Sequence, residues 1–235
     1  MATTTGARAY ALLDNAIGKK TLVAVTGAIL FGFVVAHLAG NMLVLLGEEA
    51  LNDYGALLHA IPELLWMARL VLLGSVITHI ALSIQIARQA RAARSVQYRA
   101  YADGTQQSIL QSYARKTMII SGPVVGAYIV FHLLHLTVGA DVVPGYTFEE
   151  GQVYANFVHG FRVPWITAFY LFANTLLGLH LFHGGQAIFQ TLGLRHPQWD
   201  KRTRPLAFGL ATFITVGNTA LPLLTLARVI GADVP

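Results

Sequence analysis

The stretch "GPVVGAYIVFHLLHLTVG" (residues 122–139) carries two histidines, three positions apart, inside an otherwise uncharged and mostly apolar run. It belongs to the apolar segment 117–139, which is long enough for a helix to cross a hydrocarbon core of about 30 Å. Four further segments of this kind occur at 21–46, 64–87, 163–190 and 205–227. The sequence therefore predicts five transmembrane helices.

The composition agrees with a membrane protein. The chain has 235 residues, of which 55% are hydrophobic and 11% are charged, whereas soluble domains carry about 25% charged residues. The connections between the segments are short, which favours one domain over residues 1–235. We expect an all-α, multi-pass membrane protein whose first apolar segment is a retained anchor, because it is too long for the core of a cleavable signal. There is no cysteine, which excludes disulfides, iron–sulfur ligation and covalent haem attachment in this chain.

The charges alternate between the connections. Lys and Arg gather at the N-terminus, in the second connection and in the fourth, whereas the first and third connections are mainly acidic. This is the positive-inside pattern, and it predicts a cytoplasmic N-terminus and an external C-terminus. The net charge of +5 therefore orients the chain and gives no reason to expect nucleic-acid binding. The basic residues concerned are Arg8, Lys19, Lys20, Arg88, Arg91, Arg94, Arg99, Arg115, Lys116, Arg195, Lys201, Arg202 and Arg204.

Six of the nine histidines lie inside apolar segments, and the other three (His59, His159 and His196) are assigned to loops. A helix rises 1.5 Å per residue, which places the six at two depths above the cytoplasmic ends. The outer level holds His37 at ~24 Å, His132 at ~22 Å and His135 at ~27 Å. The inner level holds His79 at ~12 Å, His180 at ~14 Å and His183 at ~9 Å.

In an antiparallel bundle of the first four helices, the first and third lie diagonally across the core, as do the second and fourth. Each level then offers two imidazoles that face each other, an arrangement typical of a haem iron held by two histidines. Two levels predict two b haems and electron transfer across the membrane. Zinc needs a tight cluster of four ligands, and a proton relay usually includes Asp or Glu, which the middles of the segments lack. A single intramembrane histidine can also simply bond a neighbouring helix.

Periodicity does not choose within the doublets His132/His135 and His180/His183, because side chains three residues apart point within about 60° of each other. Matching depths favour His132 and His180, and Gly184 lies one turn after His180 on the same face, where it leaves room for a porphyrin edge. His135 and His183 are alternative ligands, or contacts to haem propionates or to a quinone oxygen nearer the helix ends.

Four local patterns carry a family resemblance: "AHLAGN" (36–41), "VITHI" (76–80), "FHLLH" (131–135) and "HLFHGGQAIFQTLG" (180–193). Together they resemble the single-chain, five-helix, dihaem cytochrome b subunit of succinate:quinone oxidoreductases, the succinate dehydrogenases and fumarate reductases. In that family a ligand histidine is followed four residues later by glycine, and a glycine ends the helix about thirteen residues on, as at His180, Gly184 and Gly193. The resemblance implies His37 and His132 for the outer haem, and His79 and His180 for the inner haem.

The resemblance also implies partners and a reaction. A flavoprotein with FAD and an iron–sulfur subunit would dock on the cytoplasmic side of a bacterial-type inner membrane. This chain would anchor them and pass electrons through the haems to a quinone, typically menaquinone, and the complex can form higher oligomers. It would be the quinone-reactive subunit of the enzyme and carry no dicarboxylate chemistry itself, so no catalytic residue is assigned.

Some dihaem fumarate reductases carry a glutamate two residues before the fourth-helix ligand, in a transmembrane proton path; here that position is Gly178. Arg69, Glu63 and Arg162 near the outer ends are candidates for propionate or quinone contacts, or interfacial residues with no ligand. A cytochrome b subunit of a hydrogenase or formate dehydrogenase also carries bis-histidine haems, but normally meets its partner on the outer face. A haem-free transporter is the remaining alternative, although the sequence lacks the paired broken helices of that class.

Overall fold

The computed structural model describes residues 15–92, 109–193, 197–232 and 234, which are mostly helical and contain no strand. Five helices in this part of the chain are long and apolar enough to cross a membrane. Helices are the expected element here, because lipid offers no hydrogen-bond partner to an open backbone. The predicted all-α fold, with five helices long and apolar enough to span a membrane, is confirmed for the described residues.

The five long helices overlap the five predicted segments. Their bounds are α2 Ala16–Asn41, continued by the 3-10 turn η1 Met42–Leu46; α4 Pro62–Ala92; α5 Ile109–Leu133, continued by the π-helical turn η2 Leu134–Val138; α7 Pro164–Thr191; and α8 Pro197–Leu226. Two shorter helices, α3 Glu48–His59 and α6 Val153–Phe161, lie in the first and third connections. His59 and His159 are therefore helical, and their assignment to loops was wrong; His196 lies outside the described residues.

The helix ends follow from local chemistry. The side chain of Asn15 accepts a hydrogen bond of 2.6 Å from the backbone N–H of Gly18 and caps the start of α2. Pro164 occupies the first turn of α7, where its missing N–H is not needed. Gly139 and Gly193 follow η2 and α7 with φ of 73° and 71°, a left-handed conformation that ends a helix at little cost only when the residue is glycine.

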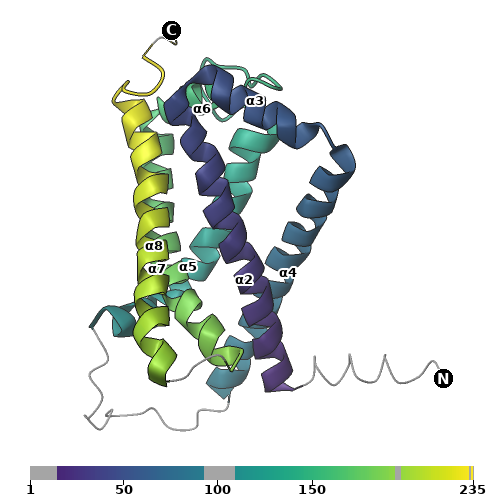
Figure 1. Cartoon of the computed structure of the whole chain (residues 1–235), viewed down its shortest axis with the longest axis vertical. Helices are drawn as coiled ribbons and strands as arrows, with labels where there is room; N and C mark the ends of the chain where they lie inside the picture. Colours follow the sequence, from purple (N-terminus) through teal and green to yellow (C-terminus); the bar gives the residue numbers. More distant parts are fainter. Residues whose placement is uncertain (1–14, 93–108, 194–196, 233, 235) are drawn as a thin grey trace, which may run out of the picture.

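The long helices alternate in direction, so that α2 begins at one end of the structure and α8 finishes at the other (Figure 1). We call the end that carries α3 and α6 the outer end, and the opposite end the inner end. Helix α7 packs against α8, α5 and α2, and α4 packs against α2 and α3. Among the described residues α4 and α5 make only a small contact, in which Ile80 of α4 lies beside Gly126 of α5.

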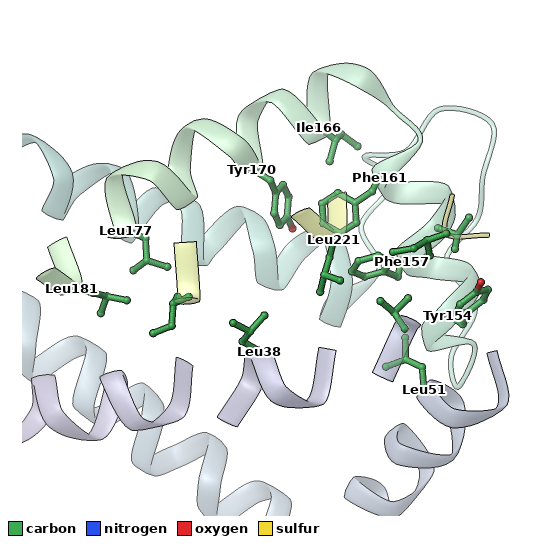
Figure 2. Close-up of a cluster of buried hydrophobic side chains, with 14 of the residues drawn as sticks. Leu38, Leu51, Tyr154, Phe157, Phe161, Ile166, Tyr170, Leu177, Leu181 and Leu221 are labelled. Carbon is green, nitrogen blue, oxygen red and sulfur yellow. The ribbon is translucent and has the colours of Figure 1, made fainter. Parts of the chain in front are cut away.

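The apolar core lies toward the outer end, where α2, α6, α7 and α8 meet (Figure 2). Leu38 of α2 is fully buried and packs on Gly217 of α8, where an added Cβ would lie 2.7 Å from a Leu38 methyl group. Phe161 and Tyr170 join this core from α6 and α7, at 2% exposure each. The core fixes the outer half of α7. This helix carries four residues of the candidate site: Tyr170, His180, His183 and Gly184.

Candidate haem-binding site

The structure brings four of the six span histidines into two facing pairs. The outer pair joins His37 of α2 to His132 of α5, with ring centroids 5.6 Å apart and ring planes at 89°. The inner pair joins His79 of α4 to His180 of α7, with ring centroids 6.3 Å apart and ring planes at 62°. Each pair therefore combines the first and third, or the second and fourth, of the membrane-spanning helices.

The ring of His79 is oriented by hydrogen bonds from α2. Its Nδ1 lies 3.1 Å from the carbonyl oxygen of Val23 and 3.3 Å from Oγ1 of Thr26. Because a carbonyl oxygen only accepts, Nδ1 carries the proton in the neutral ring, and Nε2 keeps its lone pair. Gly27 lies directly beside the ring, since a Cβ there would come within 3.1 Å of Cε1 of His79. Helix α2 thus holds the imidazole through Nδ1, and the lone pair of Nε2 is left to bind a metal.

His180 has a comparable second contact. Its Nδ1 lies 3.4 Å from the hydroxyl oxygen of Ser121 on α5, and this serine is fully buried. One turn further along α7, a Cβ added to Gly184 would meet no described atom within 4 Å. No described atom therefore occupies the side of Gly184 where the sequence pattern predicts room for a porphyrin edge.

The outer pair is held by aromatic side chains. Nδ1 of His132 lies 3.2 Å from the hydroxyl oxygen of Tyr170, and the ring of His37 stacks on Phe33, one turn earlier in α2, at 5.2 Å. The hydrogen bonds to His79, His180 and His132 all involve Nδ1, so each of these rings can direct Nε2 toward its partner ring.

His135 lies in a different environment from His132. It is 3% exposed, and its Nδ1 lies 3.0 Å from the hydroxyl oxygen of Tyr170. Its Nε2 lies against the backbone of α6, where a Cβ added to Gly160 would come within 2.3 Å of that nitrogen. The ring is thus covered by α6, and it is His132 that faces His37. In the other doublet, His180 is the histidine that faces His79.

The geometry of the pairs fits an iron bound by two imidazoles. Metal–nitrogen bonds of about 2 Å on opposite sides of one metal, with each ring centroid about 1 Å beyond its nitrogen, separate the centroids by roughly 6 Å. The observed separations are 5.6 and 6.3 Å. Histidines that bind metals usually donate their second N–H to an acceptor, as His79 does. In the part of the chain that the structure describes, no three His, Asp or Glu side chains gather around a point, whereas haem needs only two protein ligands.

The charged candidates at the outer end have structural contacts. Arg162 donates hydrogen bonds to the carbonyl oxygens of Gly231 and Val234 and so fastens the C-terminal segment to α6. The guanidinium of Arg69 lies 5.1 Å from the ring of Trp66, one turn earlier in α4, as is common for arginines at a membrane interface. Glu63 is exposed in the first turn of α4.

The segment 139–152 covers His135 at the outer end and is fastened by Asn156. The Oδ1 of Asn156 accepts from the hydroxyl of Tyr146 at 2.8 Å and from the backbone N–H of Glu149 at 3.0 Å. Its Nδ2 donates to the carbonyl oxygen of Glu149 at 2.7 Å. A small cavity remains beneath the segment, lined by His135, Ala140, Val143, Tyr146, Phe148 and Asn156.

Two titratable rings stack at the edge of this cavity, because Tyr146, which lines it, packs on His159. The rings of Tyr146 and His159 are 4.1 Å apart and nearly parallel. Burial lowers the pKa of His159, and the charge of Arg162 lowers it further, while Glu149 opposes the shift. Burial raises the pKa of Tyr146, and Glu149 adds to this. Both shifts favour the neutral forms of the two rings.

Gly178 is the position where some dihaem fumarate reductases carry a glutamate, and here it is a close contact between α7 and α8. A Cβ added to Gly178 would lie 2.0 Å from Oγ1 of Thr215, and that hydroxyl donates to the carbonyl oxygen of Ala211 at 2.7 Å. Helix α8 thus occupies the space that a longer side chain at this position would need.

We expect Gly178→Ala to destabilise the protein. Overpacking of this kind typically costs about 1–3 kcal/mol, which should be visible as a lower midpoint of thermal unfolding in detergent. Gly209→Ala on α8 is the matched control, because a Cβ there meets no described atom within 4 Å. The double variant Gly178→Ala/Thr215→Ala should recover most of the loss. Equal midpoints for Gly178→Ala and Gly209→Ala would contradict this close packing.

Sequence reasoning missed the groups that orient the histidines: Thr26, Ser121 and Tyr170, and the glycine at 160 that covers His135. All but Gly160 are polar side chains in apolar segments, which is a usable signal, but their partners come from other helices. Comparison of the chain with protein-family models, with curated proteins and with solved structures finds no match. The function is therefore inferred from the chain's own residues.

Proposed function

We propose that this chain is the membrane-anchor and electron-transfer subunit of a succinate:quinone oxidoreductase that binds two b haems. The observation that carries the proposal is the presence of two facing histidine pairs, His37/His132 and His79/His180, at two depths of one helical bundle. Intramembrane ionisable residues are costly and are usually retained for function. Four of them arranged as two pairs at ligand spacing favour a pair of redox cofactors over isolated hydrogen bonds.

The chain's residues hold and orient two haems in this proposal. Nε2 of His79 and His180 would bind the inner haem, and Nε2 of His37 and His132 the outer haem, while the Nδ1 contacts fix the rings. Each haem supplies an iron that accepts and releases one electron. Ser121, which contacts the inner pair, and His132 are separated by ~16 Å along α5 at 1.5 Å per residue. The two levels therefore divide the distance across a hydrocarbon core of about 30 Å into shorter steps.

The charge distribution supports an electron donor at the inner end. Basic side chains are exposed there at Lys20, Arg88, Arg91, Arg202 and Arg204. The outer end carries the acids of α3, together with Glu149 and Glu150. With the positive end in the cytoplasm, the iron–sulfur and flavoprotein subunits would dock at the inner end, and the quinone would react nearer the outer pair.

The two helices that supply the inner pair are unbroken, which weakens the transporter alternative. Both α4 and α7, which supply the inner pair, are continuous over their full lengths of 31 and 28 residues, whereas ion-coupled transporters bind their substrates at interrupted helices. The cytochrome b subunit of another quinone-linked dehydrogenase would have the same histidine pairs. It differs from the proposed subunit in the substrate that supplies the electrons, which is hydrogen or formate and not succinate.

Succinate-dependent reduction of the haems tests the proposed reaction. Membranes that contain the chain with its native partners should show reduced b-haem absorption after addition of succinate, and malonate, a competitive dicarboxylate, should block this reduction. Fumarate should reoxidise the haems after reduction with a quinol. If hydrogen or formate reduces the haems and succinate does not, the chain belongs to one of the other dehydrogenases.

A further inference from the structure

One phenol lies between two histidines at the outer level. The hydroxyl oxygen of Tyr170 is 3.2 Å from Nδ1 of His132 and 3.0 Å from Nδ1 of His135. Tyr170 is 2% exposed, so water does not replace either contact. A tyrosine hydroxyl has one proton to donate and can accept from a second group. The two contacts are therefore linked, since the hydroxyl donates to only one of them.

We propose that Tyr170 is a positioning residue for His132, and that His135 in turn positions Tyr170. In this arrangement Nδ1–H of His132 donates to the oxygen of Tyr170, and the hydroxyl of Tyr170 donates to Nδ1 of His135. The inference rests on the proposed function, because it requires Nε2 of His132 to be the nitrogen that binds iron. The direction of both hydrogen bonds then follows from that single assignment.

The packing holds the phenol in this position. The ring of Tyr170 meets Phe161 edge-on at 4.7 Å and Tyr128 edge-on at 5.2 Å. Figure 2 shows Tyr170 beside Phe161 and Leu221 in the core of the outer half. A ring enclosed on these sides cannot swing its hydroxyl away without disturbing the core, so the hydrogen bonds are fixed by tertiary packing.

The state of His135 agrees with this role. Its Nε2 is buried and has no hydrogen-bond partner among the described residues, and such a group normally lowers stability. A leucine would fill the same space without that cost. The useful atom of His135 is therefore Nδ1, which accepts from Tyr170, and the tight fit against Gly160 keeps that atom in place.

The hydrogen bonds from His132 to Tyr170 and from Tyr170 to His135 should lower the midpoint potential of the outer haem and leave that of the inner haem unchanged. An acceptor on the far nitrogen of a ligating imidazole makes the ligand more basic, and hydrogen bonding around the ligands sets the potential of a haem. Removal of the acceptor should raise the midpoint potential of the outer haem. The inner pair is oriented by Val23, Thr26 and Ser121, so its potential provides an internal reference.

Redox titration of Tyr170→Phe in the purified full-length chain tests the inference. We expect both haems to remain bound and one midpoint potential, that of the haem lost in His132→Ala, to rise while the other stays constant. Tyr128→Phe is the matched control, because it removes a hydroxyl from the ring next to Tyr170 and His132 without removing the acceptor. A merely structural effect of losing a buried hydroxyl would appear in both variants.

His135→Leu provides a second, independent test. It removes the acceptor of the Tyr170 hydroxyl, so it should raise the same potential by a smaller amount, and it should have no further effect in a Tyr170→Phe background. Unchanged potentials in both single variants, with two haems bound, would overturn the inference and leave the proposed function standing. A native chain that binds no haem would instead remove the proposed function.

Discussion

His132→Ala and His180→Ala are each expected to remove one of two b haems and to leave the other. The reason is geometric: His132 faces His37 and His180 faces His79, in pairs formed by different helices. Loss of one ligand leaves an iron with a single protein bond, which is too weak to hold the cofactor through purification. The unaffected pair keeps its own Nδ1 contacts. Haem per chain, measured as the pyridine haemochrome, should fall by about half.

His135→Ala and His183→Ala are the matched controls in the same doublets. His135 is covered by α6 at Gly160, and His180 is the α7 histidine that faces His79, so both control variants should keep two haems. If the controls lose a haem and His132→Ala and His180→Ala do not, the function stands but the ligands are His135 and His183.

Gly184→Leu should expel the inner haem while the fold stays intact. A Cβ at Gly184 meets no described atom within 4 Å, so the protein itself has room for a larger residue. In our proposal that room beside His180 is filled by the edge of a porphyrin. The pyridine haemochrome should therefore fall by about half, as in His180→Ala, because the inner haem is lost and the outer haem is kept. The midpoint of thermal unfolding, measured without haem, should stay close to that of the native protein without haem.

Gly209→Leu is the control for the Gly184 variant, because a Cβ there also meets no described atom within 4 Å and the residue is exposed on α8. It should keep both haems. If Gly184→Leu keeps two haems, the inner porphyrin does not lie over Gly184. Of the two features that favour His180 over His183, only its position facing His79 would then remain.

The sequence predicts the long helices well because the membrane sets their length. Each apolar segment of about 20 residues has one structural solution in lipid, and five such helices are present. The short helices α3 and α6 could not be predicted in this way. They contain 12 and 9 residues and lie across the outer end. They do not cross the hydrocarbon core, so its thickness does not set their length.

The choice within the His132/His135 doublet shows the limit of periodicity. The two residues are three positions apart in one apolar segment, so a regular helix would place both on nearly the same face and periodicity leaves both as ligand candidates. The structure separates them through a residue in another helix, Gly160 of α6, whose backbone lies against His135. The contacts of His79 and His180 with Thr26 and Ser121 are likewise between helices, and no local pattern encodes them.

The most direct test of the account is the haem content of the native full-length chain. The chain, purified in mild detergent with whatever binds to it, should show a reduced-minus-oxidised spectrum of b type and a pyridine haemochrome of about two haems per chain. A folded, helical chain with no haem would contradict the central claim, and the four facing histidines would then have to be explained as hydrogen-bonding residues of a haem-free membrane protein.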